Sequence, residues 1–145
     1  MVGLADGGVD EAQDALTGAV LEILATGCSG RMTIIATVTD RLVEAGHQVI
    51  IVTGDRDLFQ LVDDERDIAV LYMGGGPYAK SSGPVEIRRE GVLATLGVTP
   101  EEVVDLKALT GDTSDNIPGV KGVGPKTAIN LLQAYGDLDQ VYAAV

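Results

Sequence analysis

Apolar positions in the first half of the chain switch between helical and extended spacing. Residues 11–25 place their apolar side chains on one face of a helix, and residues 31–45 repeat them at intervals of three and four. Residues 48–53 and 68–73 are short, mostly apolar runs, which are typical of strands buried on both faces in a parallel sheet. A short helix is expected over 56–61. This order of helices and strands predicts an α/β fold.

The pattern becomes helical after a glycine-rich stretch at 74–83, which is expected to be a loop that touches a substrate or joins two parts. Residues that are typical of helix ends support the helices that follow. Proline stands at the first position of a predicted helix, and glycine directly follows the last position of one. The predicted helices are 87–96, 99–109, 125–135 and 138–145. The chain is thus predicted to consist of an α/β piece, residues 1–85, and an all-helical piece, residues 86–145.

Composition narrows the possible functions. The 145 residues carry a formal net charge of −12, which argues against a protein that coats nucleic acid by charge alone. Cys28 and His47 are the single cysteine and histidine, so an internal disulfide and a thiolate or histidine-rich metal site are excluded. We expect His47 at the surface. No secretory signal and no apolar run near ~20 residues is found, which predicts a cytoplasmic protein without a membrane partner.

The first candidate site follows the predicted strand 48–53. Asp55 and Asp57 would project from the carboxyl end of that strand, where ligands gather in open parallel sheets. Two carboxylates at this spacing suit Mg²⁺, which takes a few carboxylates and several waters. The alternative is that Asp55 only caps the short helix after it. Position alone favours neither interpretation.

A second acidic pair follows the predicted helix 99–109. Asp112 and Asp115 are three residues apart and can face the same way on a helical turn. Helix capping is the alternative, since aspartate is an ordinary capping residue. Two separate acidic pairs in so short a chain favour one shared metal site, because two-metal hydrolysis needs several carboxylates.

The third candidate site is a glycine-rich turn before the helix 125–135. It leaves backbone N–H groups of Gly122–Gly124 and of the first helical turn exposed, and such groups bind phosphate oxygens. Lys121 and Lys126 add positive charge beside them. A purely structural turn is the alternative, but it does not explain two lysines beside close glycines.

At this point two segments resemble a known family. VIIVTGDRDLFQLV and ALTGDTSDNIPGVKGVGPKTAINLL are similar to the 5′→3′ exonuclease domain of bacterial DNA polymerase I, within the structure-specific 5′ nucleases and flap endonucleases. The match is strong over about residues 34–145 and weak over 11–33. It implies an α/β fold with a partial parallel sheet flanked by helices, as in a truncated PIN-like nuclease core. An all-helical helix-hairpin-helix subdomain (H3TH) that grips duplex DNA would follow.

The resemblance also implies roles for particular residues. The family's second group of catalytic, metal-binding aspartates corresponds to Asp55, Asp57, Asp112 and Asp115, which would bind Mg²⁺ or Mn²⁺. The family's hairpin holds a monovalent cation, such as K⁺, through backbone carbonyls that we place at Val120 and Val123. The implied DNA contacts are Lys121, Gly122, Gly124, Lys126 and Thr127.

The chain departs from the family at its amino-terminal side. The family's Glu-Ala-Asp-Asp metal-binding signature aligns with residues 30–33, Gly-Arg-Met-Thr, which contain no carboxylate. The chain therefore looks like the carboxyl-terminal half of the nuclease domain, and Asp6-Gly7 resembles the family's first aspartate without a predicted strand before it. The resemblance implies a hydrolase with weak or no activity of its own. Its implied partners are duplex DNA with a 5′ flap or 5′ end, and a missing amino-terminal nuclease half or a polymerase domain.

Two other functions are compatible with the motifs. One is a non-catalytic helix-hairpin-helix DNA-binding fragment, in which the aspartates are structural. The other is a Mg²⁺-dependent phosphohydrolase of the haloacid-dehalogenase type, which also combines a strand-end Asp-x-Asp with a downstream Gly-Asp. Against the second, Thr53 and Gly54 separate the apolar run from Asp55, whereas the nucleophile of that family ends its strand directly.

Overall fold

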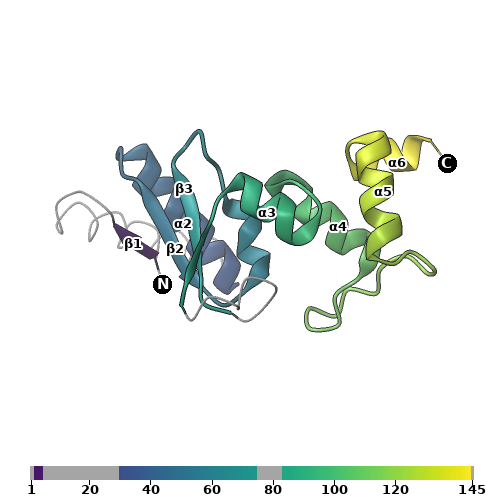
Figure 1. Cartoon of the computed structure of the whole chain (residues 1–145), viewed down its shortest axis with the longest axis horizontal. Helices are drawn as coiled ribbons and strands as arrows, with labels where there is room; N and C mark the ends of the chain where they lie inside the picture. The colour runs from purple at the N-terminus through teal and green to yellow at the C-terminus, as the bar shows by residue number, and fades with distance from the viewer. Residues whose placement is uncertain (1, 5–29, 75–82, 145) are drawn as a thin grey trace. The chain divides into compact units, whose positions relative to one another are not determined.

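The computed structural model describes residues 2–4, 30–74 and 83–144 (Figure 1). The chain divides into two compact units, Met1–Arg88 and Arg89–Val145, and each is described by itself. The predicted helix 11–25, Cys28 and Lys80 of the predicted loop lie outside the described residues.

The first unit is built on a four-stranded sheet in the order β1-β2-β3-β4. Its centre is the predicted parallel pair, in which Val49 lies opposite Ile68 and Thr53 opposite Tyr72. The two edge strands are antiparallel to their neighbours, so the sheet is mixed. The strands are β1 (Val2–Leu4), β2 (Val49–Thr53), β3 (Ile68–Tyr72) and β4 (Val85–Ile87).

The edge strands were not predicted, because each has only three residues and carries too little periodicity to detect. The expectation that no strand precedes Asp6 is wrong, since β1 does. Ile87 ends β4 opposite Val70 and is 2% exposed. It is therefore a sheet residue, and the helix predicted from that position begins two residues later.

Burial explains why the central strands form where they do. Val49, Ile51 and Val70 are fully buried, so the apolar runs lie in the interior of the unit. Helix α2 (Arg31–Glu44) lies next to β1 and β2 and buries Val38 and Leu42. The 3-10 helix η1 (Arg56–Leu61) lies next to β2 and β3.

His47 is buried, and the expectation of a surface position is wrong. The chain turns tightly after α2, and the backbone N–H of His47 donates to the carbonyl of Leu42 at 3.0 Å. This turn brings the imidazole under cover. The polar and small residues on either side of His47 give no apolar signal from which the burial could be predicted.

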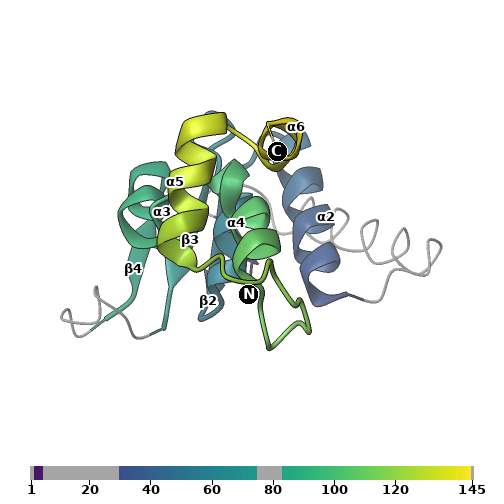
Figure 2. The same ribbon diagram turned by 90° about the vertical axis from the view of Figure 1, so that its right-hand side faces the viewer.

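The regular elements described in the second unit are all helices, as predicted. The predicted helix 99–109 is divided, because Thr99 N–H donates to Glu102 Oε2 at 2.8 Å and a 3-10 turn precedes the α-helix. The core is formed mainly by Val98, Val103, Leu109, Ala128 and Leu132. The elements are α3 (Arg89–Leu96), η2 (Pro100–Glu102), α4 (Val103–Thr110), α5 (Pro125–Tyr135) and α6 (Leu138–Ala143) (Figure 2). Among the described residues, no helix is long and apolar enough to cross a membrane.

A pair of leucines tests the helical core. Leu132 is 1% exposed and Leu93 is 49% exposed. Leu132→Ala should lower the free energy of unfolding by about 2–5 kcal/mol, because it removes buried apolar surface and leaves a cavity. Leu93→Ala should change it by less than about 0.5 kcal/mol. Urea denaturation followed by circular dichroism measures both. Equal effects of the two substitutions would contradict this core.

Candidate functional site

The first acidic pair lies directly after β2. Thr53 Oγ1 accepts the backbone N–H of Asp55 at 3.0 Å, and Asp55 Oδ1 accepts the backbone N–H of Asp57 at 3.0 Å. Asp55 is therefore the N-cap of η1, the alternative that its position left open. Capping uses one carboxylate oxygen, so it is compatible with a cation at the other. Asp55 is exposed and Asp57 is half-buried.

A basic side chain is held at the same end of the sheet. Arg56 Nε donates to the hydroxyl of Tyr72 at 3.1 Å, and the guanidinium carbon lies 5.7 Å from the centre of the Tyr72 ring. Phe59 packs edge-on against Tyr72, with ring centres 5.4 Å apart. The Arg56 side chain is thus held against the last residue of β3.

The start of α2 confirms the departure noted in the sequence. The first turn of α2 contains no acidic residue, and Gly30 caps it without a side-chain hydrogen bond. Gln60 Nε2 donates to the backbone carbonyl of Asp57 at 2.8 Å and lies 3.9 Å from Met32 Sδ. Met32, at one of the positions aligned with the family signature, therefore presents a thioether to the amide of Gln60, which in turn bonds the backbone of Asp57.

In the second unit, Asp112 begins a closed loop. Backbone bonds of 2.9 and 2.8 Å join Asp112 and Ile117 in both directions. At the neck of the loop Gly111 and Gly119 touch through their backbones, and a Cβ on Gly119 would lie 2.4 Å from Gly111 N. Both have positive φ, +79° and +66°. Glycine is therefore required on both sides of this neck.

Both oxygens of Asp112 are engaged. Lys107 Nζ, from α4, donates to Asp112 Oδ2 at 2.6 Å, and the two side chains are only 23% and 19% exposed. Asp112 Oδ1 accepts the backbone N–H of Ser114 at 2.8 Å and also the Ser114 hydroxyl. The Lys107 ammonium first, and then Ser114, hold the pKa of the Asp112 carboxyl far below its usual range.

The donor set of this loop fits a hard divalent cation. A carboxylate oxygen of Asp115 lies within 4.8 Å of one of Asp112, and Asp115 is exposed. Asp112 Oδ2 keeps a second lone pair beside its bond to Lys107, whereas Oδ1 already accepts two hydrogen bonds from Ser114. Oxygen donors at this spacing suit Mg²⁺ or Mn²⁺. The loop brings Asp112 and Asp115 together as the sequence predicted.

The predicted phosphate-binding turn is a tight hairpin. Val120 O accepts the backbone N–H of Val123 at 3.0 Å, and Val120 N–H donates to Leu109 O at 2.8 Å, which ties the hairpin to α4. Gly124 precedes Pro125 at the start of α5 without a side-chain cap. All five predicted DNA contacts are exposed: Lys121, Gly122, Gly124, Lys126 and Thr127. Figure 1 shows the hairpin in green, just before α5.

The valines of the hairpin have a structural role that the sequence did not indicate. The side chains of Val120 and Val123 line an almost wholly apolar cavity of about 270 Å³. The other lining residues are Leu109, Leu131, Leu138, Val141 and Tyr142. These contacts anchor the hairpin to the helical core. The predicted cation site at the Val120 and Val123 carbonyls stays a prediction.

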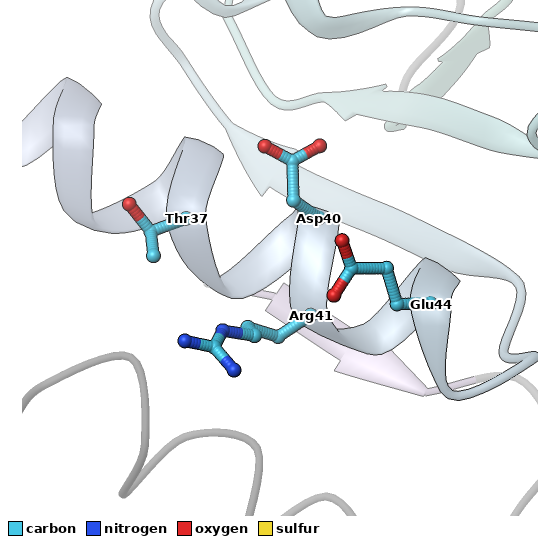
Figure 3. A pocket seen from close by; sticks show the side chains of 4 residues that line it. All are labelled: Thr37, Asp40, Arg41 and Glu44. Carbon is cyan, nitrogen blue, oxygen red and sulfur yellow. The ribbon is translucent and has the colours of Figure 1, made fainter. Parts of the chain in front are cut away.

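A polar hollow on α2 is not part of this site. It is lined by Thr37, Asp40, Arg41 and Glu44, which recur along one face of the helix (Figure 3). Asp40 pairs with Arg66 at 2.8 Å, and the two side chains are 56% and 42% exposed. Exposed pairs of this kind contribute little. The hollow is a charged, solvated helix face that contains none of the predicted site residues.

Comparison with known proteins gives the family context. Residues 98–145 match the family described as 5′-3′ exonuclease, C-terminal SAM fold. The chain is 52% identical over 99 residues to DNA polymerase I of Synechocystis sp., covering 68% of this chain and 10% of that protein. It is 43% identical over 93 residues to a 5′-3′ exonuclease of Bacillus subtilis, covering 64% of this chain and 29% of that one. The chain thus spans only a small part of these relatives.

A solved structure has the same fold. The bacteriophage T5 flap endonuclease, in a pseudo-enzyme-product complex with DNA and metal ions, superposes with a TM-score of 0.61 at 21% identity. The match covers 77% of this chain and 38% of that one. These comparisons confirm the resemblance and the fold class predicted from the sequence.

Acid titration tests the environment of Asp112. The pKa of Asp112 is lowered in the folded state, so its pair with Lys107 stabilises the fold at every pH above the ordinary pKa of aspartate. This contribution is lost progressively as the pH falls below that value into strong acid. Ser114→Ala should raise the pKa of Asp112 slightly, and Lys107→Met should raise it more. Carboxyl ¹³C shifts measured by NMR against pH give both values. The reverse order would contradict the dominant role of Lys107.

Proposed function

We propose that the chain is the DNA-binding half of a nuclease of the 5′-3′ exonuclease and flap endonuclease family, because it resembles part of such a domain. In this proposal the helical unit binds the duplex backbone, and the aspartates bind a divalent metal ion. The observation that supports it best is the exposed hairpin before α5 together with the uncapped start of that helix, which carry Lys121 and Lys126 respectively.

Binding of the DNA backbone is argued from the hairpin. Pro125 has no N–H, so the first free amides of α5 belong to Lys126 and Thr127, and both residues are exposed. Such amides point at an anion, and the helix dipole favours negative charge there. Lys121 and Lys126 form no ion pair with any described residue, so their charges are available for phosphates. These contacts bind DNA without regard to sequence.

Divalent metal binding is argued from the donor set. We propose that Asp55, Asp57, Asp112 and Asp115 contribute ligands to divalent metal, Mg²⁺ or Mn²⁺, with K⁺ at the hairpin carbonyls. Such an ion activates water and stabilises charge on a scissile phosphate. The protein's own part is to orient the carboxylates: η1 and Thr53 hold Asp55, and Ser114 and Lys107 hold Asp112.

The same residues argue that cleavage by this chain alone is weak. The first turn of α2, where the family has carboxylates, provides none. A second metal ion would therefore lack protein ligands, and two-metal hydrolysis needs both ions to stabilise the attacking and leaving oxygens. The substrate proposed for the complete nuclease is duplex DNA with a 5′ flap or a 5′ end. An amino-terminal nuclease half or a polymerase domain would complete the activity.

The phosphohydrolase alternative is disfavoured by the position of Asp55. β2 ends at Thr53, and Asp55 lies beyond Gly54 as the cap of η1. A nucleophilic carboxylate would have to attack phosphorus while also holding the N–H of Asp57. The non-catalytic DNA-binding fragment is instead the limiting case of our proposal, in which metal affinity is too low for any cleavage.

DNA binding is tested with a fluorescent duplex that carries a 5′ flap. Lys126→Glu should weaken binding about tenfold and reduce the slope of log K against log salt by about 0.9, because one phosphate contact is lost. Arg66→Glu makes the same change of net charge in the exposed pair with Asp40 and should leave the slope unchanged. Anisotropy titrations between roughly 50 and 200 mM salt measure both the binding constant and its dependence on salt. Equal losses in both variants would overturn the assignment of the hairpin.

Cleavage is tested on the same substrate, labelled at its 5′ end. With Mg²⁺ and then Mn²⁺, we expect binding with little or no product, because part of the ligand set is absent. Gel analysis of product size measures it. Robust product that disappears in Asp55→Ala would show that a working metal site exists without the carboxylates missing from residues 30–33. Our explanation of those residues would then be wrong.

A further inference from the structure

We propose that Lys107 is an internal counter-cation of the acidic loop, which neutralises Asp112 when no metal is bound and limits the affinity for divalent cations. The inference rests on the metal binding proposed above. Lys107 belongs to none of the motifs from which metal or DNA binding was predicted.

The geometry distinguishes this lysine from the exposed ones. Its ammonium nitrogen lies 2.6 Å from Asp112 Oδ2, and its side chain is only 23% exposed. The carboxylate of Asp112 is 19% exposed, and its other oxygen is held by Ser114. The carboxylate therefore cannot swing away from Lys107 without losing the bonds to Ser114. The paired arrangement is held from both sides.

A metal ion at this carboxylate would meet the ammonium directly. Any cation bound to Asp112 would lie within a few ångströms of a positive charge in a partly desolvated site, where repulsion is weakly screened. A bound metal ion must therefore either share the carboxylate of Asp112 with the Lys107 ammonium or displace that ammonium. In either case the lysine lowers the affinity, while it stabilises the loop in the metal-free chain.

Mn²⁺ binding to the full chain tests this role without any cleavage assay. Lys107→Met retains the apolar stem and removes the charge, and it should tighten Mn²⁺ binding about five- to tenfold. Lys107→Arg retains the charge and should stay close to the parent chain. Electron paramagnetic resonance of free Mn²⁺ gives the dissociation constants, and circular dichroism checks that each variant is folded.

Arg89→Met is the matched control. It makes the same change of net charge in the same unit, and its pair with Glu101 is exposed, with side chains 48% and 63% accessible. It should leave Mn²⁺ affinity nearly unchanged. A tightening in Lys107→Met no larger than in Arg89→Met would overturn the proposal, since net charge alone would explain it.

A different result is expected if the acidic loop does not bind metal at all. If Asp112→Asn binds Mn²⁺ as well as the parent chain does, then the acidic loop is not a metal site, and both this proposal and the proposed metal role fail. DNA binding by the hairpin would still be measurable in that case. If Mn²⁺ binding falls in Asp112→Asn but is equal in Lys107→Met and the parent chain, only the role of Lys107 is wrong.

Discussion

The close backbone approach of Gly111 and Gly119 is the constraint on which the functional part of the helical unit depends. At this neck α4 ends, the loop that carries Asp112 and Asp115 closes, and the hairpin before α5 begins. A single added methyl group would have to displace backbone atoms, so both the acidic loop and the hairpin would move. One small contact thus positions two chemically different elements, an anionic loop and the hairpin that carries Lys121.

Elements with long or repeated patterns could be predicted from the sequence, whereas short ones could not. The apolar runs of β2 and β3 and the periodicity of α2 and α5 are strong signals, since each depends on many side chains. Helix α5 begins at Pro125 and ends at Tyr135, as predicted. The three-residue strands β1 and β4 depend on pairing with distant residues, and so does the burial of His47. The local sequence does not predict contacts of this kind.

The candidate site shows the same contrast between features that the local sequence predicts and features that depend on the fold. The aspartates and the hairpin lysines were found because their types and spacing point to metal and phosphate chemistry. The contacts that hold the aspartates were not predicted: Lys107 and Ser114 hold Asp112, and Gln60 holds the backbone of Asp57. Lys107 and Ser114 lie close to Asp112 in sequence, so a helix-end lysine near an acidic loop was the one available signal. The Arg56–Tyr72 contact joins η1 to β3, and no local pattern indicates it.

The placement of positive charge bears on the proposed binding of a polyanion by so acidic a chain. A net charge of −12 repels DNA at long range, so affinity has to come from a few local contacts at short distance. In the helical unit, Lys107 is paired with Asp112, whereas Lys121 is exposed on the hairpin and Lys126 at the start of α5. Pairing Lys107 internally reduces the negative field of the acidic loop near the hairpin without adding a cation. The lysine that neutralises the loop and those that face solvent thus have complementary roles, and the glycine neck sets the distance between them.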